Sequence, residues 1–364
     1  MPALSTTPSK ILVTGANGYI GLWTVKSLLE RGFSVRAVVR SESKSEVLQS
    51  IFPKFVGNGK LEFAFIGDLT KESAFDEAVK GVEGILHLAS PLPSASPDPQ
   101  ETVRPAVEGT IGILKSALHH GSSIQRIVIT SSIASQITPS TEARTYTEAD
   151  WNERVEQDVK SGNPFFIYRA SKTLAERAAW DFYTNNKSLI AWDLATINPS
   201  FVYGPPLEPS ISTPSGLGGT QNIWWNTVIN ATPEKTKEAL GVQGGSAWVD
   251  VRDVAEAHVR ALEREEAGGE RITASSESYI WQEWLDLVNR LAPKSIRPSL
   301  PQGYPDLTSS GKVAYLVSFD NGKSERVLGL KYRTKEETLR DVLEDAERRG
   351  WWKNEESSEH HGKL

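Results

Sequence analysis

Short runs of Val, Ile and Leu alternate with longer stretches of periodically spaced apolar residues through the first 200 residues. A continuous apolar run is typical of a strand buried on both faces, and a period of three to four residues is typical of an amphipathic helix. Because strands and helices alternate along the chain, the pattern predicts an α/β fold with a doubly wound parallel sheet. The expected strands cover residues 10–15, 34–40, 61–68, 84–90, 126–132 and 190–200.

The alternation breaks down after about residue 200. Residues 203–220 are rich in Pro, Gly and Ser, which predicts a long loop. Residues 246–265 have the pattern of a strand followed by a helix, and we expect them to return to the first sheet. The expected organisation is therefore a first domain of residues 1–200 with 246–265, a smaller α/β lobe of residues 201–245 and 266–352, and a flexible tail of residues 353–364.

Composition and charge exclude several classes of protein. The 364 residues carry a formal net charge of -6, whereas nucleic-acid-binding proteins are usually basic, so no nucleic-acid partner is expected. The chain contains no Cys, and its paired His residues lack carboxylate partners at ligand spacing, so neither disulfides nor a metal is expected. No secretory signal and no apolar run long enough to span a membrane is apparent, which favours a cytoplasmic protein.

The segment TGANGYIG follows the first predicted strand and opens the first predicted helix. Glycines let the backbone approach a pyrophosphate, and the helix N-terminus offers free amide donors. Three glycines alone are weak evidence, but their place between strand and helix predicts dinucleotide binding. The expected cofactor contacts in this segment are Thr14, Gly15, Asn17, Gly18, Tyr19, Ile20 and Gly21.

The end of the second strand indicates which dinucleotide is bound. An NAD-binding protein usually carries an acidic residue there for the ribose diol, but this chain has Val39 and Arg40, with Lys44 close by. A guanidinium can pair with a 2′-phosphate, so we predict NADPH/NADP+. The alternative is that Arg40 is an ordinary surface arginine.

The ends of the next strands supply further cofactor candidates. Asp68, followed by Leu69, can accept a hydrogen bond from the adenine amino group, although Asp68 suits a helix N-cap almost as well. His87 lies within an apolar strand and is interpreted as a core histidine. The remaining candidates at these strand ends are Ala89, Ser90, Pro91 and Thr130.

A tyrosine and a lysine lie one helical turn apart in the segment YRASK, after a fifth strand that ends in hydroxyl residues. The Ser132 hydroxyl can bind a substrate carbonyl oxygen, and the Tyr168 hydroxyl can transfer a proton to it. Free tyrosine titrates near pH 10, and a neighbouring ammonium such as Lys172 is expected to lower its pKa. In isolation, Tyr168 and Lys172 favour a core tyrosine beside a solvated lysine; the upstream motifs reverse this and favour the catalytic interpretation.

These motifs together resemble the extended short-chain dehydrogenases/reductases, which have a Rossmann-type fold. The chain is similar to their branch of dihydroflavonol reductases, yeast methylglyoxal reductases and fungal aldehyde or ketone reductases. The resemblance spans about residues 10–350 and includes PAVEGTIGILKSA, ITSSIAS, YRASKTLAERAAW, NPSFVYGP and WVDVRDVAEAHVRAL.

The resemblance implies a role for each residue that matches the family pattern. Ser132 orients the substrate, Tyr168 is the general acid, and Lys172 tunes Tyr168 and binds the ribose. Pro199, Phe201 and Val202 fall where the family holds the nicotinamide carboxamide, and the smaller lobe closes over the substrate. An asparagine that many superfamily members use in a proton relay is not apparent, so a water or a backbone carbonyl is left to complete that relay.

The predicted function is an NADPH-dependent reductase that acts on the carbonyl of a small aldehyde, ketone or ketoester. Phe165, Trp224 and Trp225 are the predicted walls of the substrate pocket, in addition to Ser132. A nucleotide-sugar epimerase or dehydratase, a hydroxysteroid dehydrogenase and a non-catalytic NADPH sensor remain the alternatives. The sequence leaves monomer and homodimer open.

Overall fold

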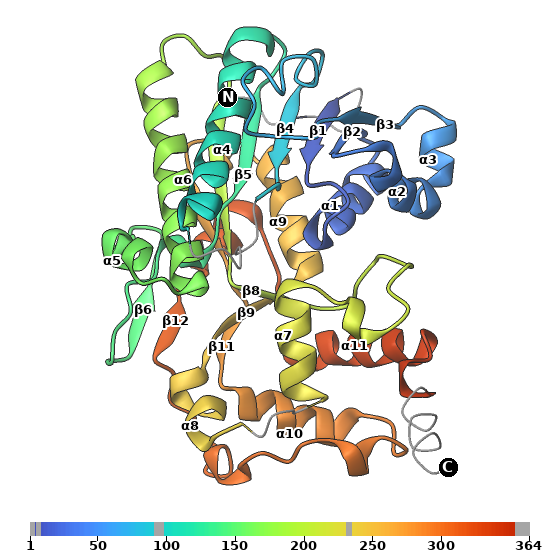
Figure 1. The fold of residues 1–364 in the computed structure, drawn as a ribbon, viewed down its shortest axis with the longest axis vertical. Helices are drawn as coiled ribbons and strands as arrows, with labels where there is room; N and C mark the ends of the chain where they lie inside the picture. Colours follow the sequence, from blue (N-terminus) through green and yellow to red (C-terminus); the bar gives the residue numbers. More distant parts are fainter. Residues whose placement is uncertain (1–3, 5–8, 91–97, 231–234, 354–364) are drawn as a thin grey trace.

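A computed structural model describes residue 4 and residues 9–90, 98–230 and 235–353 of the chain. Its centre is a seven-stranded parallel sheet in the order β10-β7-β5-β4-β1-β2-β3 (Figure 1). The strand order reverses between β1 and β4, as in a doubly wound fold whose ligand lies at that crevice. The strands are β1 (Lys10–Thr14), β2 (Ser34–Val39), β3 (Leu61–Phe65), β4 (Gly84–His87), β5 (Arg126–Thr130), β7 (Asp193–Pro199) and β10 (Arg271–Ala274).

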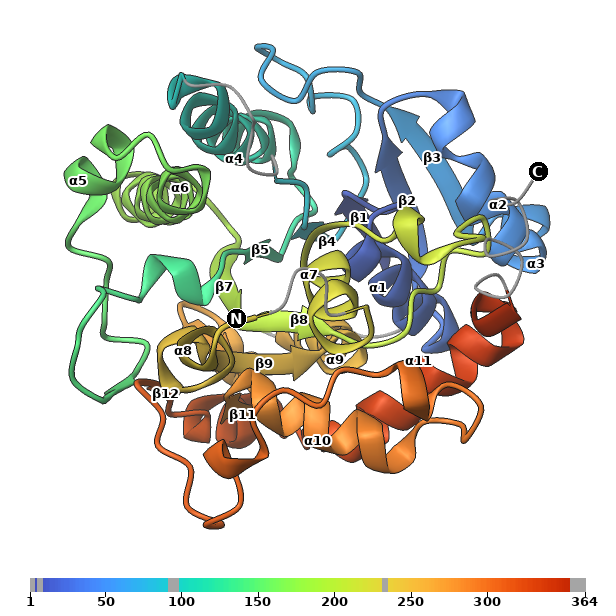
Figure 2. The ribbon, with the colours of Figure 1, turned by 60° about the horizontal axis from the view of Figure 1, so that its bottom comes forward.

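Helices cover both faces of the sheet, and alternate strand residues face the two layers. In β1, Ile11 and Val13 belong to the core beneath α1 and α9, whereas Leu12 belongs to the core beneath α4 and α6. Figure 2 shows α4 and α6 side by side on one side of the sheet and α1 and α9 on the other. The helices of this part are α1 (Tyr19–Glu30), α2 (Glu46–Ile51), α3 (Pro53–Gly57), α4 (Gln100–His120), α5 (Val155–Lys160), α6 (Pro164–Asn186) and α9 (Val251–Glu263).

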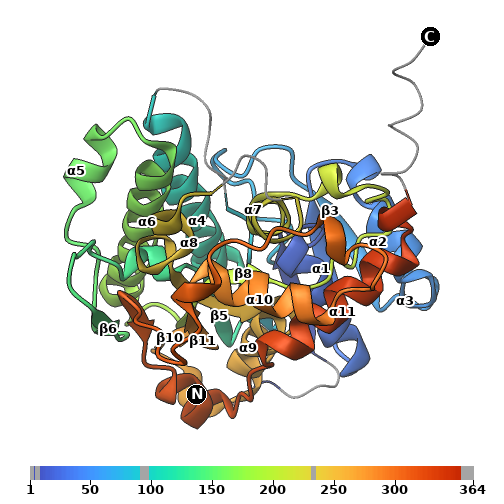
Figure 3. The same ribbon diagram turned by 90° about the horizontal axis from the view of Figure 1, so that it is seen from below.

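A smaller lobe packs against the carboxyl edge of the sheet and has a core of its own (Figure 3). Trp284 lies at the centre of this core, with its ring 5.0 Å from that of Trp248 and 5.7 Å from that of Trp224. The lobe contains β8 (Phe201–Tyr203), β9 (Ser246–Asp250) and β11 (Glu277–Tyr279) in one small sheet, β12 (Val317–Phe319) paired with β6 (Arg144–Tyr146), and the helices α7 (Gly219–Val228), α8 (Lys237–Leu240), α10 (Trp281–Leu291) and α11 (Lys335–Arg348).

Two parts of the chain differ from the organisation that the sequence predicts. β9 was expected to return to the first sheet, but it pairs with β8 and β11 in the lobe, and only α9 after it packs on the main sheet. β10 was assigned to the lobe with residues 266–352, but it pairs with β7 as the outermost strand of the main sheet. Both strands are short apolar segments whose pairing partners lie far away in the sequence, so local pattern does not identify their sheet.

The long loop that precedes α7 is held by side chains from distant elements. Tyr19 of α1 donates a hydrogen bond to the carbonyl of Gly204 over 2.8 Å, and Trp23 donates to that of Pro205 over 3.1 Å. From the carboxyl end of the chain, Arg349 donates to three loop carbonyls and Trp351 to a fourth. The first helix and the last helical segment therefore fix this loop between them.

The described residues show neither a candidate membrane span nor a candidate metal site. No helix among these residues is both long and apolar enough to cross a membrane. Within the same ranges, no group of three or more His, Cys, Asp or Glu side chains has the arrangement of a metal site.

Candidate active site

The glycine segment forms a tight cradle between β1 and α1. Gly15 has a φ of 66°, and a Cβ there would come within 2.9 Å of the backbone nitrogen of Ala89. A Cβ on Gly21 would lie 2.1 Å from the carbonyl oxygen of Gly15, and one on Gly18 would lie 3.2 Å from it. A side chain at Gly15 or Gly21 would therefore collide with backbone, and one at Gly18 would be tightly placed.

The start of α1 has the features of an anion site. The helix begins after Gly18 with no side-chain cap and no acidic residue in its first turn, so its amide donors have no competing side chain. These donors and the cradle fit the pyrophosphate of a dinucleotide. Asn17 lies in the turn before the helix, whereas the Tyr19 hydroxyl and the Ile20 side chain face the lobe, so these two residues can offer a cofactor only their backbone.

The residues predicted to favour NADPH over NADH lie at the end of β2. Arg40 and Lys44 are exposed there, and neither side chain has a hydrogen bond or ion pair with another residue in the described part of the chain. Arg40 directly follows β2, the strand next to β1, and Lys44 ends the short turn after it, so both positive charges lie at the same carboxyl edge as the glycine cradle. This placement suits a 2′-phosphate.

The Asp68 carboxylate is already engaged in a local turn. It accepts hydrogen bonds from the backbone nitrogen of Thr70 over 2.9 Å and from the Thr70 hydroxyl over 2.6 Å. These bonds lower the pKa of Asp68, and the residue remains exposed at the end of β3. The segment after Asp68 forms a series of turns, not the helix that an N-cap at this residue would begin. Leu69 packs beside Gly109 of α4, and both predicted adenine contacts stay predictions.

The end of β4 is joined to the glycine segment by hydrogen bonds. Thr14 Oγ1 accepts a bond from the Ala89 backbone nitrogen over 3.1 Å and shares a hydrogen bond with His87 Nδ1 over 2.9 Å. Burial lowers the pKa of His87 to about 3, so the ring is a neutral core histidine, as the sequence indicated. Ala89 and Ser90 line the cavity beside it, and Pro91 lies outside the described residues.

The predicted catalytic residues lie together at the carboxyl end of β5, where α6 packs against the short turn that follows this strand. Ser132 follows β5 in extended conformation and caps a short turn, where its hydroxyl accepts a hydrogen bond from the Ala134 backbone nitrogen over 3.1 Å. Tyr168 and Lys172 leave the same face of α6, and Lys172 Nζ lies 5.9 Å from the centre of the Tyr168 ring. The Ser132 side chain also hydrogen-bonds with Tyr168. Three residues from two segments are thus brought together.

The pKa of Tyr168 differs in direction from the sequence-based expectation. Burial raises it to about 12, and the hydrogen bond with Ser132 opposes this only in part. Lys172 Nζ faces the ring and donates to the Thr130 carbonyl over 3.2 Å. Burial lowers the pKa of Lys172 to about 8, with the charge of Glu176 acting in the opposite direction. Desolvation therefore outweighs the attraction between phenolate and ammonium in this arrangement.

Thr130 presents different groups to different partners. Its carbonyl accepts from Lys172, and a relay of protons behind this lysine stays a prediction. Its hydroxyl donates to His258 Nε2 of α9 over 2.6 Å, while His258 Nδ1 donates to the Val254 carbonyl over 2.7 Å. Burial lowers the pKa of His258 to about 4 and keeps it neutral.

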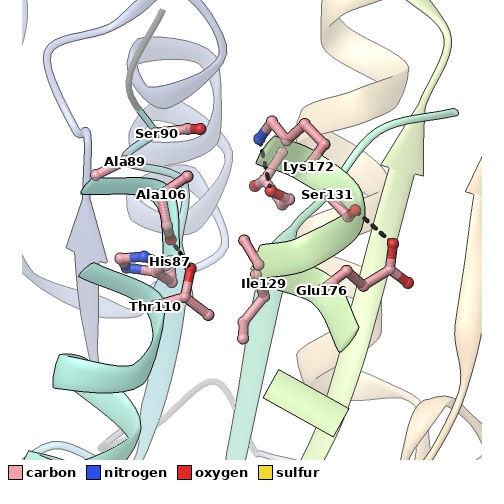
Figure 4. A pocket seen from close by; sticks show the side chains of 11 residues that line it. His87, Ala89, Ser90, Ala106, Thr110, Ile129, Ser131, Lys172 and Glu176 are labelled. Carbon is pink, nitrogen blue, oxygen red and sulfur yellow. Dashed lines mark hydrogen bonds between the residues drawn. The ribbon is translucent and has the colours of Figure 1, made fainter. Parts of the chain in front are cut away.

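A buried carboxylate that the sequence did not indicate lies behind these residues. Glu176 is one turn beyond Lys172 on α6 and lines the same cavity as Lys172 and Ser131 (Figure 4). It accepts hydrogen bonds from Ser131, Ser135 and Asn198 and pairs with Arg271. Its spacing from Lys172 was visible in the sequence, but the four partners come from three other segments.

The remaining predicted residues lie in three places. Pro199 ends β7, and Phe201 and Val202 begin β8, so they continue the carboxyl edge next to the catalytic residues. Phe165, at the start of α6, is 53% exposed and free to border a pocket. Trp224 and Trp225 are buried in the aromatic core of the lobe, where Trp225 stacks on Trp352. Their contact with a substrate stays a prediction.

The fold and this site define a dinucleotide-binding oxidoreductase of the Rossmann type. Residues 11–274 match the family described as the NAD dependent epimerase/dehydratase family. The chain belongs to this family, and the similarities below confirm its place among the extended short-chain dehydrogenases/reductases.

Relatives and solved structures agree with this assignment. The chain is 31% identical to the NADPH-dependent methylglyoxal reductase GRE2 of Saccharomyces cerevisiae, over 91% of this chain and 96% of that protein. It is 32% identical to the ketoreductase azaE of Aspergillus niger, over 89% of this chain and 93% of that one. The crystal structure of yeast methylglyoxal/isovaleraldehyde reductase Gre2 complexed with NADPH superimposes with a TM-score of 0.84 at 30% identity, covering 94% of this chain and 99% of the other.

Proposed function

We propose that this chain is an NADPH-dependent reductase that converts the carbonyl of an aldehyde, ketone or ketoester to an alcohol. The observation that carries the proposal is the meeting of Ser132, Tyr168 and Lys172 at the sheet edge that also holds the glycine cradle. The names of the relatives, a methylglyoxal reductase and a ketoreductase, support the same reaction class.

NADPH supplies the hydride when it is bound. Tyr168, with a pKa raised to about 12, is protonated at neutral pH and donates its proton to the carbonyl oxygen. The Ser132 hydroxyl donates a hydrogen bond to the same oxygen and orients the carbonyl. The Lys172 ammonium, which faces the tyrosine ring, stabilises the phenolate left after proton transfer and holds the cofactor ribose.

The chain's basic residues account for the preference between the two dinucleotides. Arg40 and Lys44 are exposed at the end of β2 and free to bind a 2′-phosphate. A tightly held NAD, typical of the alternative epimerase function, calls for an acidic residue near Val39, and none ends this strand.

The two parts of the chain have different proposed roles. The part of the chain that contains the seven-stranded sheet binds NADPH, and the lobe built around Trp284 binds the substrate. The protein acts in the cytoplasm on small molecules, as a monomer or a homodimer. Exposed Phe165 at the start of α6 and half-buried Phe201 at the start of β8 are the proposed apolar surroundings of the substrate.

The direct test is NADPH consumption by the purified protein with a panel of aldehydes, ketones and ketoesters. We expect turnover with at least one class and formation of the matching alcohol. NADPH that binds without turnover on any member of the panel would contradict the proposal and favour the sensing alternative.

A further inference from the structure

Glu176 has more hydrogen-bond donors around it than an ion pair needs. Its side chain is fully buried. Oε1 accepts a bond from Arg271 Nε over 2.6 Å and from the Thr196 hydroxyl over 3.2 Å. Oε2 accepts bonds from Asn198 Nδ2 over 2.8 Å and from the hydroxyls of Ser131 and Ser135, each over 2.5 Å. Both oxygens of this carboxylate are therefore satisfied by neighbouring strands and the turn after β5.

The three donors to Oε2 surround Ser132. Ser131 precedes it, and Ser135 lies at the end of the short turn that Ser132 caps. The Ser135 hydroxyl lies 2.8 Å from the Ser132 carbonyl oxygen, and Asn198 Nδ2 lies 3.3 Å from it. The carboxylate thereby fixes the backbone on both sides of the residue whose hydroxyl meets the substrate.

Arg271 is itself held on the far side of the carboxylate. Its guanidinium lies 3.6 Å from the centre of the Trp151 ring and donates to the Asp150 carbonyl over 3.0 Å. Arg271 belongs to β10, the outermost strand, so the pair connects this strand to α6. Glu176 thus has little freedom to change its position.

Stability alone does not explain this arrangement. Removing two charges from water costs several kcal/mol per ion, and apolar side chains of similar size often stabilise a core as well as a buried ion pair. A carboxylate does what an apolar side chain cannot: it accepts from both serines and places a negative charge one turn from Lys172.

We propose that Glu176 is a positioning residue for the reaction: it holds Ser132 through Ser131, Ser135 and Asn198, and it keeps Lys172 in its charged form. The inference rests on the proposed reductase function and adds a residue to it. Glu176 touches neither substrate nor cofactor in this role, and acts through the residues that do.

The charged and titratable groups that face Lys172 determine whether the loss of Glu176 raises or lowers the pKa of this lysine. On α6 these are Tyr168 and Glu176, and from the neighbouring strands come His87 of β4 and, behind Glu176, Arg271 of β10. Through Thr130, His258 of α9 is linked to the same point, and both histidines are neutral. Glu176 is the negative charge among them, so its loss lowers the pKa of Lys172 further below about 8.

The test compares wild-type protein with Glu176→Gln and with the double variant Glu176→Gln/Arg271→Met. The double variant removes both charges of the pair, so it avoids the buried unpaired arginine that can unfold the single variant. Each protein is measured for Tm, kcat, KM, Kd for NADPH and the pH dependence of kcat with one reactive aldehyde.

We expect kcat to fall at least about 10-fold in both variants, with KM and the NADPH Kd changed less than about threefold. We also expect the alkaline limb of kcat to move at least about half a pH unit lower. The double variant should recover thermal stability without recovering kcat or the position of this limb.

A purely structural role would give a different result. If the double variant recovers kcat and the wild-type pH profile together with its Tm, Glu176 serves only the fold and the inference is overturned. Unchanged kcat and pH profile in a folded Glu176→Gln protein would overturn it as well. A wild-type protein without turnover on any carbonyl would instead overturn the proposed function, and the inference with it.

Discussion

Helix α6 carries two Tyr–Lys pairs with the same spacing and nearly the same geometry. Lys172 Nζ lies 5.9 Å from the centre of the Tyr168 ring, and Lys187 Nζ lies 5.7 Å from that of Tyr183. The first pair is near the beginning of the helix, and the second is at its end. Spacing on a helix therefore does not distinguish a catalytic pair from an ordinary cation–π contact.

The surroundings of the two pairs differ. Lys172 is buried and donates to the Thr130 carbonyl at the carboxyl edge of the sheet, whereas Lys187 is exposed and ends the helix. Tyr168 has Ser132 as a hydrogen-bond partner, whereas Tyr183 stacks on Trp192 with ring centres 6.0 Å apart. A hydroxyl residue at a strand end and a buried cation are what make the first pair suitable for proton transfer.

Two buried arginine–carboxylate pairs show the same contrast between the edges of the sheet. Arg126 of β5 donates to both carboxylate oxygens of Asp193 of β7, at 2.5 and 2.8 Å, at the amino ends of these strands. Within the described ranges, no serine hydroxyl donates to Asp193. At the opposite edge Glu176 binds Arg271 and also both serines of the catalytic turn. We therefore expect the pair at the amino edge to serve stability and the pair at the carboxyl edge to serve the reaction.

The largest expected effect follows from replacing Lys172, the lysine of the first pair. Lys172→Ala should lower kcat by about 10²–10⁴-fold and weaken NADPH binding, because it removes both the charge beside Tyr168 and the ribose contact. Lys187→Ala is the matched control and should leave kcat and NADPH affinity unchanged. Steady-state kinetics and fluorescence titration with NADPH measure both. Equal effects of the two substitutions would contradict the assignment of roles.

The amino-edge pair should respond in stability rather than in activity. Asp193→Ala leaves Arg126 buried without its partner and should cost about 3–5 kcal/mol in the free energy of unfolding. Urea unfolding measures this, and kcat per folded molecule should remain that of the wild type. A loss of kcat at full folding would show that the two edges are not separate in function.

A substitution at the end of β2 should change the choice of cofactor. Arg40→Ala removes a charged hydrogen bond to the 2′-phosphate, so kcat/KM for NADPH should fall by about 10–100-fold while that for NADH is retained. Arg36→Ala, within the same strand, is the control: its guanidinium pairs with Glu62 over 2.6 Å and should affect stability only. An unchanged ratio of NADPH to NADH activity in Arg40→Ala would refute the role of Arg40.

The smallest expected effect concerns a single hydroxyl. Ser131→Ala removes one bond to Glu176, worth about 1 kcal/mol, and should lower kcat by about fivefold with little change in KM. Ser123→Ala, whose hydroxyl bonds the Val82 carbonyl over 2.8 Å before β5 begins, removes a comparable bond without a change in kcat. If the two variants lose kcat equally, the Ser131–Glu176 bond has no special role.

Proton transfer should also depend on pH in a defined direction. Lys172 has a pKa lowered to about 8 by burial, so its ammonium is present below that pH and lost above it. The rate of reduction should therefore fall as the pH rises through about 8. A rate that stays constant well above pH 8 would show that the charge of Lys172 is not required.

Those features that are contiguous in the chain were predictable from the sequence. The glycine cradle, the strand ends and the Tyr168–Lys172 pair are short local motifs, because each lies within one strand–turn–helix unit or one helical turn. The sheet of β9 and that of β10 were predicted wrongly, since pairing between distant strands leaves no local pattern.

The partners of the site required the three-dimensional structure. The catalytic residues come close to Glu176, Arg271 and His258 only after α6, β10 and α9 have packed. In the sequence, a lone Glu or Arg in a helix or strand is indistinguishable from an exposed surface residue. The position of Trp224 and Trp225 after a loop rich in Pro, Gly and Ser does not indicate their burial, which depends on Trp284 and Trp352 from much later in the chain.

The central claim is that Tyr168 delivers the proton to a carbonyl, and the comparison of Tyr168→Phe with Tyr183→Phe tests it most directly. The measurement is alcohol formed in a single turnover at saturating NADPH and aldehyde. We predict that Tyr183→Phe forms alcohol at the wild-type rate and that Tyr168→Phe binds NADPH but forms almost none. Alcohol formation by Tyr168→Phe at the wild-type rate would contradict the claim.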